Sequence, residues 1–186
     1  MLEQLLKWDK DIFTYLNGLG VQEYDEFWTM ITEISNWIPL FLLFIVIFIL
    51  KFPKRKAFFN ILTVTSVALF ITFLTHLIKI WVKRPRPCND ENLNSFIRIL
   101  KTPIDYSFFS GHASSSFAIT TVVFLLLRNK VKWAWIFFIW PLLFSYSRIY
   151  VGVHFPLDIL VGALIGTISG ILFYKVQGRI TVPDTW

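Results

Sequence analysis

Cysteine and charged residues are both scarce in this sequence of 186 residues. Cys88 is the only cysteine, which excludes an internal disulfide and a cysteine-based zinc site. Charged residues make up only 16% of the chain and hydrophobic residues 55%, whereas about a quarter of an ordinary soluble domain is charged. The first residues also lack the basic flank and unbroken apolar core of a cleavable signal peptide, because Glu3, Asp9 and Asp11 interrupt them. The composition favours a membrane protein.

The chain does contain long apolar runs, to which its 20 phenylalanines and 8 tryptophans contribute. A helix needs about 20 apolar residues to cross a hydrocarbon core of about 30 Å, and several stretches approach that length. We predict an all-α fold, a single membrane-embedded helical bundle over residues 1–186 with about five transmembrane helices. Residues 1–20 mix apolar and charged positions, which predicts an amphipathic helix lying at the membrane surface. The expected membrane spans are residues 27–50, 57–82, 110–127, 133–147 and 156–174.

Lysine and arginine in the short loops predict the orientation. The loops at residues 51–56, 128–132 and 175–179 are basic, so we expect them on the cytoplasmic side of the membrane, which we take to be a bacterial inner membrane. The N-terminal segment and the polar segment 83–109 are then expected on the outer, periplasmic side. Segment 83–109 is itself basic, against the usual rule, so we expect its cations to serve a function. Basic loops also explain the net charge of +6, and no nucleic-acid partner is expected.

Three groups of polar residues are predicted at the outer ends of the spans, and the first two are ambiguous alone. KIWVKRPRP contains Lys79 and Arg86 where prolines end a helix, and it suits an anion site or a basic collar at the lipid headgroups. Ser110, Gly111 and His112 open the third span. A serine cap and a glycine leave backbone N–H groups free for an anion, with the histidine beside it. For this tripeptide alone, an ordinary helix cap is the simpler interpretation.

The third group contains Arg148, His154 and Asp158. A carboxylate four residues after a histidine can reach the imidazole, hold one ring nitrogen protonated and leave the other free to attack. A buried structural His–Asp pair is the alternative, and the nearby arginine makes it the weaker one. Together the groups supply three cations, two histidines and one carboxylate. This set suits a phosphate better than a metal ion, because Mg²⁺ or Ca²⁺ needs several carboxylate oxygens. We therefore expect no metal and no cofactor.

These residues resemble the type 2 phosphatidic acid phosphatase superfamily, which also contains lipid phosphate phosphatases and vanadium haloperoxidases. Its three motifs are Lys, six residues, Arg-Pro; then Pro-Ser-Gly-His; then Ser-Arg, five residues, His, three residues, Asp. The sequence has KIWVKRPRP, FSGH and SRIYVGVHFPLD in that order, between Lys79 and Asp158. One position departs from the pattern, because Phe109 stands where the family usually has proline.

The resemblance implies a lipid phosphatase that works through a phosphohistidine. His154 would attack phosphorus, Asp158 would orient it, and His112 would protonate the leaving oxygen. The phosphoryl oxygens would be bound by Lys79, Arg86, Arg148 and the helix end at Ser110 and Gly111.

Substrate and phosphate acceptor stay open at this point. Undecaprenyl diphosphate, phosphatidylglycerol phosphate, phosphatidate and the 1-phosphate of lipid A all suit an outward-facing site. A lipid phosphotransferase would use the same histidine with a hydroxyl acceptor in place of water. An anion or lipid-phosphate transporter would use the cations but leaves the pairing of His154 with Asp158 unexplained.

A glycine-lined face is predicted on the last span, where Gly162, Gly166 and Gly170 recur every fourth residue. Such spacing lets another helix approach closely. Packing within one subunit is the preferred interpretation, and a homodimer through these glycines is the alternative.

Overall fold

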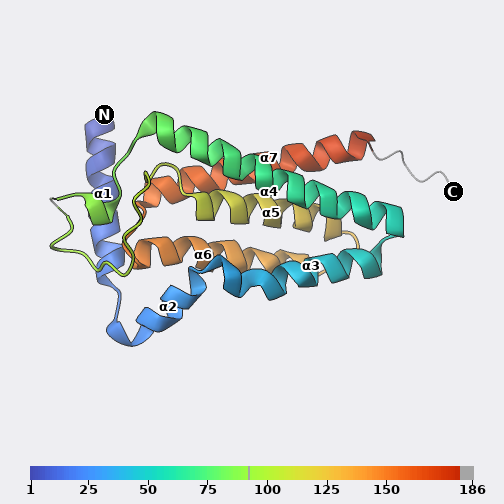
Figure 1. Ribbon diagram of the computed structural model, residues 1–186, viewed down its shortest axis with the longest axis horizontal. Coiled ribbons are helices and arrows are strands. Elements are labelled where there is room, and N and C mark those ends of the chain that lie inside the picture. The colour runs from blue at the N-terminus through green and yellow to red at the C-terminus, as the bar shows by residue number, and fades with distance from the viewer. Residues whose placement is uncertain (92, 181–186) are drawn as a thin grey trace.

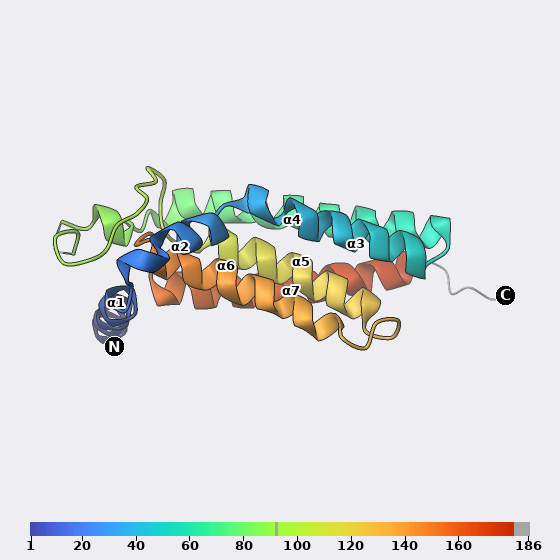
Figure 2. The same ribbon diagram turned by 90° about the horizontal axis from the view of Figure 1, so that it is seen from below.

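The computed structural model describes residues 1–91 and 93–180, and all regular elements in that part of the chain are helices (Figure 1). The predicted all-α fold is confirmed. Helices α3 to α7 lie side by side along the long axis of the molecule, and α1 crosses one end of the bundle (Figures 1 and 2). The α-helices are α1 (Leu2–Gly18), α2 (Asp25–Ile31), α3 (Ile38–Lys51), α4 (Lys54–Val82), α5 (Gly111–Leu127), α6 (Ile139–Tyr150) and α7 (Pro156–Ile180).

The first predicted span is wrong as a single helix. Instead of running through residues 27–50, the chain ends α2 at Ile31 and starts α3 after a short 3₁₀ turn. Pro39 explains the break, because proline lacks an N–H and is tolerated only in the first turn of a helix, where it lies here. The side chains of Asn36 and Trp37 donate hydrogen bonds to carbonyls at the end of α2, which stabilises the interruption.

The later spans agree better with the structure. Among the described residues, three segments are long and apolar enough to cross a membrane by length and composition, namely Ile34–Lys51, Lys54–Asn89 and Pro156–Ile180, and α5 is a shorter apolar helix. Large apolar side chains such as Leu50, Phe73 and Leu164 are more than half exposed, as expected of a surface that faces lipid. The fourth predicted span corresponds to a 3₁₀ turn at Ala134–Phe138 followed by α6.

Helix α5 is central and packs against α4, α6 and α7. The glycine-lined face of α7 lies directly on it. A β-carbon at Gly162 would lie 2.8 Å from the carbonyl oxygen of Ser110, and one at Gly166 would overlap that of Ser114. Within the chain, α5 therefore occupies this face. The same contact brings the first turns of the two helices together, because the backbone N–H of Ser110 donates to the carbonyl of Asp158 at 3.0 Å.

The two ends of the bundle differ in their charged groups. Segment 83–109 lies with α1 and α2 at one end, and the loops after α3 and α5 lie at the other (Figure 1). Segment 83–109 and the N-terminal helices therefore lie at the same end of the bundle, as the orientation argument requires. Several charged side chains of segment 83–109 pair with side chains of opposite charge in the N-terminal segment. Pairs that cross between the segments include Asp90 with Lys10, Arg98 with Asp25, and Lys101 with Glu33.

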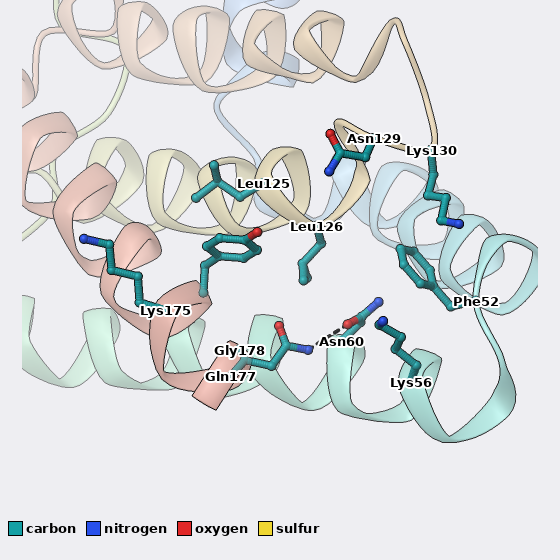
Figure 3. A pocket seen from close by; sticks show the side chains of 11 residues that line it. Phe52, Lys56, Asn60, Leu125, Leu126, Asn129, Lys130, Lys175, Gln177 and Gly178 are labelled. Carbon is teal, nitrogen blue, oxygen red and sulfur yellow. Dashed lines mark hydrogen bonds between the residues drawn. The ribbon is translucent and has the colours of Figure 1, made fainter. Parts of the chain in front are cut away.

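The end that carries the short basic loops contains a cavity of about 340 Å³ (Figure 3). Lys56, Lys130 and Lys175 line it, and the side chain of Gln177 donates to Asn60 Oδ1 at 2.7 Å on its wall. None of its lining residues in the described chain belongs to the three motifs. The motif residues lie at the opposite end of the bundle.

Candidate active site

The first motif ends α4 and folds the chain back over the bundle. Lys79 lies in the last turn of α4, and the helix stops at Lys83, whose φ of 51° is left-handed. Arg86 follows in an extended conformation, because a residue that precedes proline disfavours the helical region. Its side chain is 3% exposed. The motif therefore carries an arginine from the end of a membrane helix into the interior of the site.

His154 lies between α6 and α7 and is 1% exposed. Its Nε2 lies 3.0 Å from Nη1 of Arg86, and its Nδ1 lies 3.4 Å from Oδ2 of Asp158. A guanidinium only donates, so Nε2 accepts and Nδ1 carries the hydrogen that faces the carboxylate. Burial lowers the pKa of His154 well below its usual value, and the charges of Arg86 and Arg148 lower it further. The imidazole is therefore neutral, with its lone pair on Nε2.

The Asp158 carboxylate has further partners besides His154, the partner that the sequence predicts. Its Oδ2 accepts from the backbone N–H of Phe155 at 3.0 Å and from the hydroxyl of Ser107. Its Oδ1 accepts from Nη1 of Arg84 at 2.6 Å. Sequence reasoning missed Ser107, which carries no motif signal. It also missed Arg84, although that residue lies within the six-residue spacer of the first motif.

A second carboxylate corrects the expectation that Asp158 is the only one at the site. Asp105 lies between the first two predicted phosphate ligands, with Oδ2 2.6 Å from Lys79 Nζ and Oδ1 2.7 Å from Arg86 Nη2. Partial burial would raise the pKa of Asp105, but the hydrogen bonds and charges of Lys79 and Arg86 outweigh it and lower the pKa to about 2. An anion of the chain itself thus occupies the cationic site.

Arg148 and His112 are held by one residue of α2's C-terminal end. The hydroxyl of Thr32 contacts Nη1 of Arg148, and the carbonyl of Thr32 lies 3.2 Å from His112 Nε2. The His112 ring also stacks on Phe144, with centroids 4.5 Å apart. Arg148 Nε is buried and has no hydrogen-bond partner among the described residues. Such an orphaned donor is costly, which suits a site that receives an anionic ligand.

The second motif opens α5 as predicted. Ser110 is the N-cap, and its hydroxyl accepts from the backbone N–H of Ala113 at 3.4 Å. Gly111 begins the helix, and a β-carbon added there would be 3.5 Å from the methyl group of Thr75. The His112 ring interacts electrostatically with the charges of Arg148 and Lys79.

The structure brings all eight predicted residues to one end of the bundle. They form a cationic site beside a neutral imidazole, a set that can bind an anion and present a nucleophile to it. In the described part of the chain, no three His, Cys, Asp or Glu side chains gather as metal ligands would. The eight residues are Lys79, Arg86, Ser110, Gly111, His112, Arg148, His154 and Asp158.

The chain is similar to known proteins in sequence and in fold. A sequence model of the PAP2 superfamily matches residues 58–181. The lipid A 4'-phosphatase of Bacteroides thetaiotaomicron is 30% identical over 97% of this chain and 82% of its own length. The undecaprenyl-diphosphatase of Sulfolobus acidocaldarius is 32% identical over 97% of this chain and 83% of its own length.

Two solved structures are also similar. Aquifex aeolicus LpxE has a TM-score of 0.70 at 34% identity, covering 89% of this chain and 93% of its own. The PAP2-type phosphatidylglycerolphosphate phosphatase of Bacillus subtilis has a TM-score of 0.76 at 22% identity, covering 96% of this chain and 88% of its own. The second likeness shows the fold.

Proposed function

Because this chain belongs to the PAP2 superfamily, we propose that it hydrolyses a phosphomonoester or diphosphate of a membrane lipid through a phosphohistidine. The relatives named above are phosphatases, and the bundle has apolar helices long enough to cross a membrane. The chain is thus a membrane protein of a lipid phosphatase family, and the covalent mechanism and the substrate are the proposal.

The observation that carries the proposal is the position of the Asp105 carboxylate. It is bound by Lys79 and Arg86, and Arg86 also contacts the lone pair of His154. The site therefore holds a negatively charged oxygen group beside a nucleophilic nitrogen. The charge of Arg148 also acts on His154, so this arginine would be a further cation for a phosphoryl group that replaces the carboxylate.

In the proposed reaction, Nε2 of His154 forms a bond to phosphorus while the bond to the leaving oxygen breaks. His112 donates a proton to that oxygen, and Asp158 stabilises the positive charge on the attacking imidazole. Water then attacks the phosphohistidine and gives a proton to His112, which releases inorganic phosphate and restores both histidines. Lys79, Arg86 and Arg148 balance the charge that develops on the phosphoryl oxygens.

The proposed substrate is a lipid phosphate of the outer leaflet. Four candidates suit the site: undecaprenyl diphosphate, phosphatidylglycerol phosphate, phosphatidate and lipid A 1-phosphate. Relatives that act on lipid A and on undecaprenyl diphosphate support this class. Phosphate release by the purified protein from a panel of the four identifies the preferred lipid. Release without an added hydroxyl acceptor separates a hydrolase from a phosphotransferase.

The proposed orientation places the site on the periplasmic face of the inner membrane. The basic loops at the far end support it, because such loops stay in the cytoplasm. A reporter fused after Lys54 or Lys130 should report the cytoplasm, and one near Asn92 should report the outside. The reverse pattern would place the site in the cytoplasm.

Trapping the intermediate tests the mechanism. Rapid quenching with labelled substrate should give an acid-labile, base-stable phosphoenzyme in the wild type and none in His154→Ala. His76, which is exposed on α4, provides the matched control, and His76→Ala should trap the intermediate normally. A phosphoenzyme that persists in His154→Ala would show that His154 is not the nucleophile.

A further inference from the structure

Arg84 bridges two buried carboxylates. Its Nη1 lies 2.6 Å from Oδ1 of Asp158, and its Nη2 lies 2.6 Å from Oδ2 of Asp9. The guanidinium is centred 4.2 Å from the ring centroid of Phe155. The Asp158 side chain is fully buried and that of Asp9 is 4% exposed. Charges buried this deeply persist only when they are paired, so the arginine fixes the position of both carboxylates.

Asp9 belongs to α1, and it binds the site in a second way. Its Oδ1 accepts from the backbone N–H of Leu157 at 2.8 Å, in the first turn of α7. One carboxylate from α1 therefore holds Arg84 and the helix that carries Asp158. Helix α1 lies outside residues 58–181, the part of the chain that matches the superfamily.

We propose that Asp9 and Arg84 are positioning residues: Arg84 keeps Asp158 ionised and oriented toward His154, and Asp9 keeps Arg84 in place, so that α1 is part of the active site. This inference rests on the proposed function, because it assigns the residues that position Asp158, the partner of the proposed nucleophile His154. Arg84 binds Oδ1, which fixes the plane of the carboxylate and leaves Oδ2 facing Nδ1 of His154. An isolated carboxyl group at this depth would bind a proton and lose the charge that keeps the imidazole in one tautomer.

Asp9→Asn tests the role with little change in shape. The amide oxygen of asparagine still accepts from Leu157, but the charge that pairs with Arg84 is lost. We expect kcat for an aryl phosphate to fall about tenfold, by analogy with the lower end of the losses that follow removal of a group that orients a metal-bound histidine. The inhibition constant of inorganic phosphate should stay unchanged, because Lys79, Arg86 and Arg148 bind that ion.

Asp11→Asn is the matched control, with the same change of charge at an exposed position of α1. It should leave kcat and phosphate inhibition at their wild-type values. Two results would overturn the inference. One is an Asp9→Asn enzyme with the kcat of Asp11→Asn. The other is weaker phosphate binding in parallel with the loss of kcat, since that pattern indicates general loosening of the site.

A spectroscopic measurement decides the same question without turnover. The chain has 3 histidines, so the ring nitrogens of ¹⁵N-histidine-labelled protein give a simple spectrum. His154 should show a single neutral tautomer, protonated on Nδ1, in the wild type and in Asp11→Asn. Asp9→Asn and Arg84→Gln should show a mixture of the two neutral tautomers, because Asp158 is no longer held in one orientation. An unchanged His154 spectrum in both variants would refute the positioning role, whereas a wild-type protein that releases no phosphate would refute only the proposed function.

Discussion

Arg86 Nη1 donates to His154 Nε2 over 3.0 Å, so the arginine covers the lone pair that the proposed attack requires. The same guanidinium binds the Asp105 carboxylate through Nη2. In the proposed reaction, a phosphoryl group would therefore replace two partners of Arg86, namely the imidazole and the carboxylate. Phosphate binding and exposure of the nucleophile would then be one event, because both require the same side chain to change partners.

Replacing Asp105 should strengthen substrate binding. In Asp105→Asn the carboxylate no longer competes for Lys79 and Arg86, and its side chain is 52% exposed, so the pairs it forms are weak. Each exposed pair contributes about 0.2–1 kcal/mol, so the loss of both pairs predicts that KM falls by about 2- to 30-fold. Initial rates over a range of lipid concentrations measure this. A rise in KM would show instead that Asp105 holds the cations in their binding geometry.

The lowered pKa of His154 predicts how its ring titrates. A histidine whose folded pKa is below 6.5 stays neutral as the pH falls through that value, so the nucleophile is not lost near neutral pH. The ¹⁵N signals of the His154 ring, assigned by their absence in His154→Gln, should stay those of a neutral imidazole between pH 8 and 6.5. A protonation midpoint at or above 6.5 would contradict the effect of burial and of the neighbouring arginines.

Loss of His112 should depend on the leaving group. His112→Ala removes the proposed general acid, which is worth about 10²–10⁴ in rate for a poor leaving group such as a lipid alkoxide. An aryl phosphate leaves without protonation, so its hydrolysis should be much less affected. Comparing kcat/KM of the two substrates in the variant and the wild type measures the difference. Equal losses would argue against the acid role.

The site could be predicted from the sequence where it depends on helix ends. Lys79 lies in the last turn of α4, His112 in the first turn of α5 and Asp158 in the first turn of α7. Helix ends follow from proline, capping residues and the lengths of apolar runs, and these are local features. Because the spans alternate in direction, their polar ends meet at one face, and three spaced motifs identify the family.

The residues that support the site could not be predicted in this way. Asp9 reaches Arg84 across 75 positions, and Thr32 reaches Arg148 across 116. Both contacts depend on how α1 and α2 lie across the end of the bundle, which no local pattern encodes. Asp105 was missed for a related reason, because its segment has no regular structure and its partners are known only once the chain has folded back.

The close packing of α5 on α7 predicts a strong effect on stability. A methyl group in Gly166→Ala would overlap the carbonyl oxygen of Ser114, a backbone atom that cannot move aside easily. Overpacking of this kind costs about 1–3 kcal/mol, so thermal unfolding in detergent should occur at lower temperature. Gly178→Ala is the control on the same helix, because nothing lies within 4 Å of its added carbon. Equal unfolding temperatures for the two variants would contradict the close contact.

Chelation of metal ions separates the proposed mechanism from those of other phosphatases. Zinc and two-metal phosphatases bind their ions with clustered histidine, cysteine or carboxylate ligands. Here the carboxylates near His154 already have cationic partners, since Asp158 binds Arg84 and Asp105 binds Lys79 and Arg86. The charge of the phosphoryl group would then be balanced by arginine and lysine. Phosphate release should therefore survive exhaustive treatment with EDTA.

Vanadate supplies the matching positive test. It adopts the five-coordinate geometry of phosphoryl transfer, and a site that is complementary to the transition state binds such mimics more tightly than the substrate. Competitive inhibition by vanadate should thus persist in EDTA, and it should weaken in Arg148→Ala, which removes the guanidinium with the unpartnered Nε. If EDTA abolishes phosphate release and Mg²⁺ restores it, a metal ion supplies the charge assigned here to the cationic side chains, and the histidine mechanism is wrong.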